Sequence, residues 1–396
     1  MDEQPVPTPQ KGIKSRKRGK RNETRAGGGS FSVRIDRKIR YRVRVAPGLL
    51  DGYGEMLVSL LGRRQAFILT DNRVGSLYGR KLEESLRRAG IPAKVLSIPG
   101  GEESKSLAVY GDLLERLAEM GCARRSLLVN FGGGVVTDLG GFLASSYMRG
   151  IDYVNLPSTL LAQVDAAVGG KVAVNTGRAK NMVGAFHHPR HVAADTELLA
   201  TLPGKDYAAG LAEVVKTALI DGEELFHFLE ANRGAILERN PLITADLVFR
   251  TSNVKMRLVA KDPYERDLRR ELNLGHTLGH PIETEFQYRG IRHGEAVAVG
   301  MGVACLVAEE KGILARPELE RIFDLLQAFG LLWKEAPIPP DKVVERLRYI
   351  KLVRGGHLHF VLPAGIGRTV ITDRVSEGEL IRGIEEYEAE VERRTG

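Results

Sequence analysis

Short apolar runs alternate with amphipathic segments through the first half of the chain. The runs at 65–70, 93–98 and 126–131 have the length and the Val, Ile, Leu and Phe content of buried strands. Helical spacing of apolar residues follows near 77–89 and 106–120. Strands that alternate with helices of this length indicate a parallel sheet with helices on both faces.

From about residue 199 helical patterns dominate instead. The predicted helices lie at 207–220, 223–233, 243–261, 273–286, 295–311 and 317–329, with a β-like piece at 357–363 and a final charged helix. We therefore predict a Rossmann-like α/β nucleotide-binding domain over residues 31–204, followed by a mainly α-helical domain over residues 205–396. No internal repeat is evident in the sequence.

The positive charge of the chain is concentrated at its start. The net charge is +8, and residues 1–30 hold eight Lys or Arg against three acidic residues. This segment has almost no bulky apolar residues and ends in Gly27-Gly28-Gly29-Ser30, so we expect a disordered basic tail over residues 1–30. No recognition motif follows it, which argues against a specific nucleic-acid partner.

Hydropathy and cysteine content narrow the expected location. The longest apolar run, at 296–308, is glycine-rich and shorter than the roughly 18 residues of a membrane span, and the start of the chain has no apolar signal segment. We therefore expect no membrane partner and no secretion. The two cysteines, Cys122 and Cys305, lie in apolar sequence. They favour a reducing, cytoplasmic compartment and argue against disulfides and thiolate metal sites.

A glycine turn joins an apolar strand to a helix in VNFGGGVVTDLGGF at 129–142. Such a turn lets backbone N–H groups approach a pyrophosphate, although three glycines alone also suit a plain tight turn. Asp71 follows another strand and can accept ribose hydroxyls, while Glu102 and Lys105 lie in a polar loop after a third strand. Because the carboxyl ends of parallel strands share one sheet edge, we expect a nucleotide site there.

Polar residues interrupt apolar, glycine-rich sequence between residues 156 and 186. They are Asp165, Lys171, Lys180 and Asn181. A solvated loop would explain them, but a buried lysine needs a carboxylate or an anionic ligand beside it. We interpret this segment as part of a site for an anionic ligand.

The stretch NLGHTLGHPIETEF at 273–286 places His276 and His280 four residues apart on one helix face, with Glu283 beyond them. Zinc proteases of the HExxH type have Glu where Thr277 stands here. The spacing alone therefore fits either a metal-binding pair or histidines with ordinary hydrogen bonds.

Two further helical segments carry residues that can bind a metal ion. GLAEVVK at 210–216 carries Glu213 and Lys216 on an amphipathic helix. His293 begins the most apolar helix of the chain, and the N-terminus of a helix disfavours an imidazolium. We therefore expect His293 to be neutral, as a hydrogen-bond partner or a metal ligand.

A series of motifs resembles the dehydroquinate synthase family of the sugar-phosphate cyclases. From about Val45 to Leu362 the chain contains, in order and at family spacing, GGGVVTDLGGF, YMRG, LLAQVDAAVGGK, AKNMVGAF, GLAEVVK, LNLGHTLGH and HGEAVAVGM. Long motifs in series are far more specific than any one of them alone. The resemblance implies the dehydroquinate synthase-like fold, with an NAD-binding α/β domain and a metal-binding helical domain.

The resemblance implies a metal site formed by Glu213, His276 and His293. One carboxylate and two imidazoles suit Zn²⁺ or Co²⁺ with a position open for substrate oxygens. The resemblance places His280 near the substrate phosphate instead of the metal. Pro281, where the family usually has Ala, can kink the helix that carries these histidines.

The resemblance also implies that the sheet edge binds NAD. The implied residues are Asp71, Glu102, Lys105, Gly133, Gly134, Val135, Asp138, Ser158, Thr159 and Lys180. Transient oxidation by NAD, loss of phosphate, re-reduction and an intramolecular aldol would give 3-dehydroquinate, a step of the shikimate pathway to aromatic amino acids.

The implied substrate is a seven-carbon sugar acid phosphate, 3-deoxy-D-arabino-heptulosonate 7-phosphate. Its phosphate would meet Lys171, Asn181, His280 and, from the neighbouring subunit of a homodimer, Arg149. Its carboxylate would meet Lys255, Arg269 and Asn273, and the implied substrate contacts also include Asp165 and Lys351. The implied catalytic residues are Lys171, Lys216, Lys255, Glu265, Arg269, Asn273 and His280.

Three other functions remain open. Sister cyclases act on sedoheptulose 7-phosphate or similar substrates without this carboxylate, and they do not keep Asn273 and His280 together as this sequence does. A metal-dependent polyol dehydrogenase of the same wider fold would not need so many lysines and arginines around the sugar. A non-catalytic zinc-stabilised or RNA-associated protein would depend on the basic tail.

Two departures from the family pattern bear on the substrate. Ile350-Lys351-Leu352 stands where the family usually has Asp-Lys-Lys. The segment 176–181 reads TGRAKN where many bacterial members have HPLGKN. The motifs therefore define the reaction type more closely than the substrate.

Overall fold

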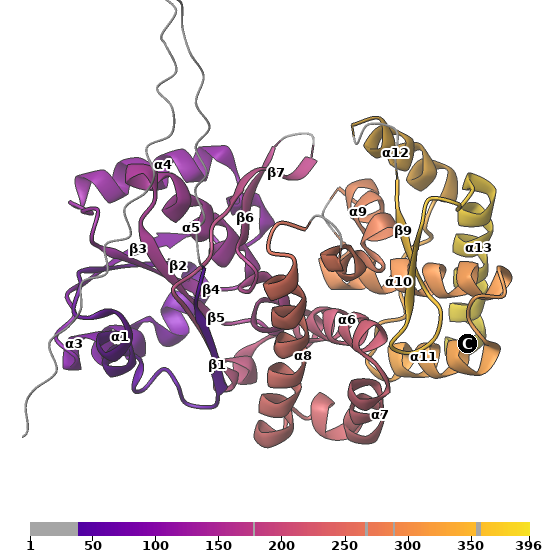
Figure 1. Cartoon of the computed structure of the whole chain (residues 1–396), viewed down its shortest axis with the longest axis horizontal. Helices are drawn as coiled ribbons and strands as arrows, with labels where there is room; N and C mark the ends of the chain where they lie inside the picture. The colour runs from indigo at the N-terminus through magenta and orange to yellow at the C-terminus, as the bar shows by residue number, and fades with distance from the viewer. Residues whose placement is uncertain (1–38, 177–178, 266–267, 288–289, 354–357) are drawn as a thin grey trace, which may run out of the picture. The chain divides into compact units, whose positions relative to one another are not determined.

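The computed structural model describes residues 39–176, 179–265, 268–287, 290–353 and 358–396 (Figure 1). Residues 40–396 form one compact unit. The expected tail at 1–30 lies outside the described residues, so its disorder stays a prediction. None of the described helices combines the length and the hydropathy needed to cross a membrane.

A six-stranded parallel sheet forms the first part of this unit. Its strands, in spatial order, are β1 (Arg42–Ala46), β8 (His191–Asp195), β5 (Asp152–Pro157), β4 (Leu127–Gly132), β2 (Ala66–Asp71) and β3 (Ala93–Ile98). Every residue of β4 is buried, as expected for an apolar strand with a layer on each side. The predicted α/β fold with a parallel sheet is confirmed.

Helices cover both faces of the sheet (Figure 1). One face carries α1 (Tyr53–Leu61) and α3 (Arg80–Arg88), and the other carries α4 (Leu107–Glu119) and α5 (Gly134–Ser146). Neighbouring residues of β2 point to opposite sides, so Ile68 packs with Leu86 of α3 whereas Leu69 packs with Leu139 of α5. Because all six strands run in one direction, their carboxyl ends lie at one edge.

A β-hairpin that the sequence analysis missed lies against α5. Its strands β6 (Lys171–Thr176) and β7 (Ala179–Phe186) pair antiparallel, within the segment interpreted above only as polar positions in glycine-rich sequence. Gly141 of α5 permits this contact, because a Cβ there would lie 2.3 Å from a methyl carbon of Val172. The backbone N–H of Asn175 donates to the carbonyl of Lys105 (2.8 Å), so the hairpin lies beside the loop after β3.

The rest of the unit is mainly helical, as predicted. Its helices are α6 (Gly204–Asp221), α7 (Glu223–Leu237), α8 (Pro241–Lys261), α9 (His276–Glu285), α10 (His293–Glu310), α11 (Arg316–Ala328), α12 (Pro340–Val353) and α13 (Glu377–Thr395), and β9 (Phe360–Pro363) pairs with β10 (Thr369–Thr372). Helix α12 was not predicted. Helix α9 contains Pro281 and continues to Glu285, so this proline does not end it. The division into domains at residues 31–204 and 205–396 stays a prediction, because residues 40–396 form one compact unit.

Helix α10 is the centre of the helical part. Fourteen of its eighteen residues are buried, as expected for a helix that is apolar on all sides. A Cβ at Gly294 would lie 1.9 Å from the carbonyl oxygen of Ala209 in α6. A Cβ at Gly300 would lie 2.0 Å from the carbonyl oxygen of Gly275, the residue before α9. Glycine at these two positions therefore lets α6 and the start of α9 contact the backbone of α10.

His191 is an unusual member of the sheet. It begins β8, is 1% exposed, and neither of its ring nitrogens has a hydrogen-bond partner among the described residues. Its neighbour in the register is Arg42 of β1. Burial, together with the charges of Arg42 and Arg44, lowers the pKa of His191 to about 4. The folded protein therefore holds this imidazole neutral.

We expect the His191→Leu variant to lose less unfolding free energy than the wild type when the pH falls. The unfolded chain protonates His191 near pH 6.5 and the folded chain only near pH 4, so falling pH favours unfolding across this window. Between about pH 7.5 and about pH 5, the wild type should lose about 2 kcal/mol of unfolding free energy that the variant keeps. Denaturant unfolding at both pH values measures this difference. Parallel pH profiles for the two proteins would contradict it.

Candidate active site

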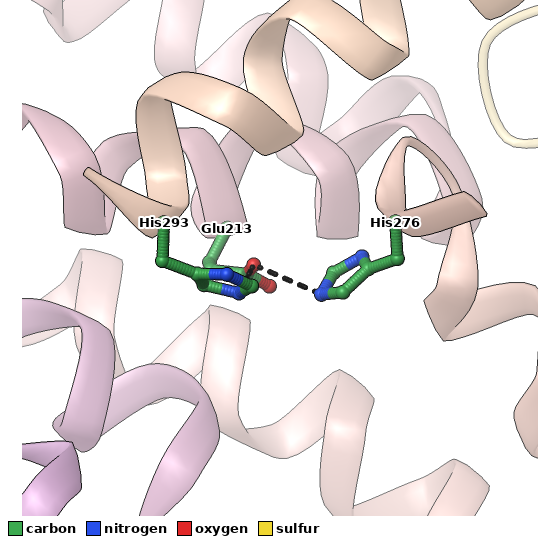
Figure 2. A group of neighbouring side chains, drawn as sticks. All are labelled: Glu213, His276 and His293. Atoms are coloured by element: carbon green, nitrogen blue, oxygen red, sulfur yellow. Dashed lines mark ion pairs between the residues drawn. The ribbon is translucent and has the colours of Figure 1, made fainter. Parts of the chain in front are cut away.

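Three side chains from separate helices point toward one another (Figure 2). Glu213 comes from α6, His276 begins α9 and His293 begins α10. Oε1 of Glu213 lies 3.5 Å from Nε2 of His276 and 3.6 Å from Nε2 of His293. This carboxylate oxygen is buried and accepts no hydrogen bond from the described residues. Three electron-rich atoms therefore face one another without a donor between them.

The surroundings orient each of the three ligand atoms. Nδ1 of His276 lies 3.2 Å from the carbonyl of Leu274, which can only accept, so Nδ1 carries the proton and Nε2 offers a lone pair. Nδ1 of His293 lies 3.0 Å from Oε2 of Glu283, with the same consequence. Lys216 binds the other oxygen of Glu213, which leaves Oε1 for the two imidazoles.

This arrangement fits a divalent metal ion. In a tetrahedral zinc site, with bonds of about 2.0–2.1 Å, neighbouring donor atoms lie about 3.4 Å apart. The observed separations of 3.5 and 3.6 Å are close to that value. Two imidazoles and one carboxylate leave the fourth position of such an ion open, which is the pattern of catalytic rather than structural sites.

A second group of possible ligands overlaps the first. It consists of His280, Glu283 and His293. Its carboxylate is already hydrogen-bonded to His293 and to Lys180 (2.6 Å), so the second group has no orphaned oxygen comparable to that of Glu213. The ring of His280 lies 5.3 Å from that of His276 and 5.9 Å from that of His293, beside the first group.

The two histidines of this group, His276 and His293, have opposite pKa shifts. Burial, aided by the charges of Lys216 and the other histidines, holds the pKa of His276 well below 6.5. Burial also acts to lower the pKa of His293, but Glu283 and Glu213 outweigh it and the pKa is raised. This shift for His293 runs opposite to the direction expected from its place at the start of a helix. The carboxylates come from other helices, which the argument from one helix could not include.

Residues expected to bind the cofactor meet at one edge of the sheet. Asp71 ends β2, Glu102 follows β3, Gly133 and Gly134 follow β4, and Ser158 and Thr159 follow β5. Gly133 is the N-cap of α5 and supplies no side chain there, so the first N–H groups of that helix face the edge without a side-chain cap. The backbone supports the expected anion site, and the individual roles, including that of Val135 in α5, stay predictions.

Hydrogen bonds and ion pairs connect this edge to the hairpin and to Glu213, His276 and His293, which we call the metal group. Nζ of Lys105 binds Asp138 (2.5 Å) and the amide oxygen of Asn181 (2.6 Å). Nζ of Lys180 binds Oε1 of Glu283 (2.6 Å) and lies 3.7 Å from Glu102. The expected cofactor residues therefore contact β7 and, through Glu283, His293 of the possible metal site.

The residues expected to bind the substrate carboxylate differ in their surroundings. Lys255 pairs with Oδ1 of Asp165 (2.6 Å), which is also among the residues expected to contact the substrate. Burial and the charge of Arg269 lower the pKa of Lys255 to about 8. Asn273 donates to Glu265 (3.3 Å), which also pairs with Lys171.

Arg269 has no carboxylate partner among the described residues, although it is 1% exposed. Its Nη1 donates to the carbonyls of Gly169 (3.2 Å) and Pro263 (3.4 Å), which accept hydrogen bonds without neutralising the charge. Gly169, at φ +100°, is close enough that a Cβ would lie 2.4 Å from Nη2 of Arg269. A buried, unpaired guanidinium is costly unless an anion binds it.

Two expected substrate residues remain without a role in the described contacts. Arg149 is exposed in the turn η3 (Tyr147–Arg149), where Met148 and Arg149 have φ values of 49° and 66°. Its position across a dimer interface stays a prediction. The side chain of Lys351 lies outside the described residues.

Glu283 is the residue of this site to which the sequence analysis gave no role. It is 2% exposed and contacts both His293 and Lys180. Burial alone would raise its pKa, but those two partners outweigh burial and hold the pKa well below its usual range. The sequence carried one signal, because Glu283 follows His276 and His280 at helical spacing on the same face.

Comparisons with known proteins cover most of the chain. Residues 95–209 match the family described as 3-dehydroquinate synthase N-terminal, and residues 210–352 match that described as 3-dehydroquinate synthase C-terminal. A 3-dehydroquinate synthase of Pelotomaculum thermopropionicum is 44% identical over 345 residues, covering 87% of this chain and 93% of the relative. A 2-epi-valiolone synthase of Actinosynnema mirum is 44% identical over 353 residues, covering 88% and 92%.

A solved structure shares the fold. ValA, the 2-epi-5-epi-valiolone synthase from Streptomyces hygroscopicus subsp. jinggangensis, superposes with a TM-score of 0.84 at 30% identity, covering 92% of this chain and 100% of that chain. That structure has NAD⁺ and Zn²⁺ bound.

We expect His276→Ala to abolish stoichiometric metal binding. Removing one of three convergent donors should weaken Zn²⁺ affinity by more than about a hundredfold, above the range for losing a residue that only orients a ligand. Metal analysis after dialysis against a weak chelator measures the loss. His227→Ala, which changes a histidine on α7 that pairs with Glu230, should keep one ion per chain. Full metal occupancy in His276→Ala would refute the ligand set.

Proposed function

The chain belongs to the 3-dehydroquinate synthase family of sugar-phosphate cyclases, and we propose that within this family it converts 3-deoxy-D-arabino-heptulosonate 7-phosphate to 3-dehydroquinate and phosphate. The observation that carries the proposal is the buried guanidinium of Arg269, which has carbonyl partners and no carboxylate partner among the described residues. A planar guanidinium suits a substrate carboxylate because its fork binds both oxygens. Substrates of the sister cyclases lack this group.

The site has the residues for a metal ion and a dinucleotide. Glu213, His276 and His293 would hold one divalent ion such as Zn²⁺ or Co²⁺, and the residues at the sheet edge would hold NAD. The two bound ligands of the ValA structure support both assignments. When bound, the dinucleotide supplies a reversible hydride acceptor and the ion supplies a Lewis acid for substrate oxygens.

The phosphate of the substrate would enter among cations that now pair with carboxylates. Lys171 pairs with Glu265, yet desolvation and the charge of Arg269 outweigh this partner and lower the pKa of Lys171. A phosphate that replaces Glu265 would pair with the ammonium group of Lys171 in its place. His280, whose ring lies beside the metal group, is the second residue proposed to bind this phosphate.

Lys255 is the residue best suited to exchange a proton near neutral pH. Its pKa of about 8 lies close to the working pH of most enzymes, and Nζ is held by the side chain and the carbonyl of Asp165, both at 2.6 Å. Lys216, in contrast, is held by Glu213, and its pKa is raised despite burial. We therefore assign proton exchange with the substrate to Lys255 and charge balance at the metal ligand to Lys216.

The second candidate function is a related cyclase that acts on sedoheptulose 7-phosphate. The Actinosynnema mirum relative, a 2-epi-valiolone synthase, supports it, as does Ile350-Lys351-Leu352 in place of the family's usual Asp-Lys-Lys. A polyol dehydrogenase is not supported, because the family matches and the curated relatives are cyclases. We also propose a homodimer in which Arg149 approaches the neighbouring site, and a cytoplasmic location.

We expect the purified protein, with NAD⁺ and Zn²⁺, to release phosphate from the heptulosonate phosphate. Sedoheptulose 7-phosphate should be a poor substrate because it offers no carboxylate to Arg269. Initial rates of phosphate release with the two compounds, measured side by side, test the proposal. If the protein turns over sedoheptulose 7-phosphate efficiently but not the heptulosonate phosphate, the proposed substrate is wrong and the cyclase assignment still holds.

We expect Arg269→Leu to lower kcat/KM for the heptulosonate phosphate by about thirtyfold to several thousandfold. This corresponds to the roughly 2–5 kcal/mol lost when one partner of a buried charged pair is removed. Arg270→Leu, at the next position of the 3-10 helix η6 (Leu268–Asn273), is the matched control. Metal content and NAD⁺ affinity should be normal in both variants. Equal kcat/KM values for the two variants would exclude Arg269 as the carboxylate-binding residue.

A further inference from the structure

Glu283 connects two groups of residues that the proposed function assigns to different ligands. It lies in α9, one turn of helix after His280, and is 2% exposed. One carboxylate oxygen faces His293, a residue of the metal group, and the other faces Lys180, a residue of the proposed cofactor edge. Lys180 is in β7, whereas His293 begins α10. One buried side chain therefore contacts both groups.

The two contacts use different oxygens and different donors. Oε2 accepts from Nδ1 of His293 at 3.0 Å, and Oε1 accepts from Nζ of Lys180 at 2.6 Å. Both partners are donors, so the site needs two acceptor oxygens, and among neutral or charged side chains of this size only an ionised carboxylate supplies two. Glutamine has the same shape but one acceptor, so it cannot satisfy both donors at once.

We propose that Glu283 is a positioning residue that presents Nε2 of His293 to the metal ion and, through Lys180, couples the affinities for metal and for NAD⁺. This inference rests on the proposed function for the role of Lys180. A proton fixed on Nδ1 keeps the lone pair of His293 on Nε2. An ion at Nε2 makes Nδ1–H a stronger donor, which draws the charge of Glu283 toward His293 and loosens its hold on Lys180. Lys180 is then available to the dinucleotide.

The coupling has a required direction. Metal binding frees Lys180 for the cofactor, so NAD⁺ should bind more tightly to the metal-loaded protein than to the metal-free protein. By linkage the metal must then bind more tightly in the presence of NAD⁺, by the same factor. Couplings of this kind are typically about fivefold to 150-fold.

Three single substitutions separate the two roles of Glu283. Glu283→Gln keeps the shape but loses one acceptor, and Lys180→Met keeps Glu283 for His293 but removes the link to the cofactor. Glu285→Gln is the matched control, because Glu285 lies on the same helix and pairs with Lys342 and Arg346 of α12, away from the metal group. Titration calorimetry gives the Zn²⁺ affinity of each full-length protein, and the NAD⁺ affinity with and without Zn²⁺.

We expect Glu283→Gln to weaken Zn²⁺ binding by about tenfold to a hundredfold, the range for residues that orient a metal ligand. Lys180→Met should keep the Zn²⁺ affinity of the wild type to within about threefold. In both variants the NAD⁺ affinity should no longer depend on the metal, whereas Glu285→Gln should keep the wild-type Zn²⁺ affinity and the wild-type coupling. The visible spectrum of the Co²⁺-loaded protein should change in Glu283→Gln and not in Glu285→Gln.

A Zn²⁺ affinity in Glu283→Gln within threefold of the wild type would overturn the positioning role. Metal-dependent NAD⁺ binding that persists in Lys180→Met would overturn the coupling, and this second test stands even if Glu283→Gln fails to fold. None of these measurements uses a sugar phosphate. If the protein does not turn over the heptulosonate phosphate, the proposed function is wrong but this inference still stands. If turnover is normal and Glu283→Gln leaves the Zn²⁺ affinity unchanged, the inference is wrong but the proposed function still stands.

Discussion

A buried carboxylate oxygen without a hydrogen-bond donor is the constraint on which the rest of the site depends. Oε1 of Glu213 faces the lone pairs of two imidazoles, and this arrangement is unfavourable unless a positive charge lies between them. The raised pKa of His293 reflects the same preference for positive charge beside Glu283 and Glu213. A divalent ion supplies that charge fully. The folded chain therefore favours a cation at this position. The three donor atoms are kept in place by Lys216, the carbonyl of Leu274 and Glu283.

The convergence of these donors depends on close helix packing. Gly294 and Gly300 let α6 and the start of α9 approach the backbone of α10, and their replacement by any larger residue would place a Cβ about 2 Å from a carbonyl oxygen. The hairpin of β6 and β7 reaches the site in a similar way, through Gly141. These glycines therefore serve function through packing. The parallel sheet contributes the other half of the site, because it brings the carboxyl ends of four strands to one edge.

Much of the fold could be predicted from the sequence, whereas the composition of the site depended on resemblance. Apolar runs and helical spacing identified the parallel sheet and most helices because those patterns are local. The β6–β7 hairpin was missed because the polar residues of this glycine-rich segment were interpreted as a ligand site, and Gly184 interrupts the pattern of β7. The spacing of His276 and His280 suggested one pair, yet Glu213 lies beside His276 and His293. No spacing rule connects three helices, so only the family resemblance indicated that set. The pairing of Lys255 with Asp165 could not be read from the sequence, because the two residues are ninety positions apart in the chain.

We propose that the chain uses its dinucleotide as a returning hydride carrier and releases phosphate without net oxidation. The most direct test follows phosphate and absorbance at about 340 nm together, with Zn²⁺, excess heptulosonate phosphate and NAD⁺ at a small fraction of the substrate concentration. We expect phosphate to rise well beyond the amount of NAD⁺ added, with no lasting gain in absorbance and no release when NAD⁺ is left out. Accumulation of one NADH for each substrate consumed would contradict the account and indicate a dehydrogenase.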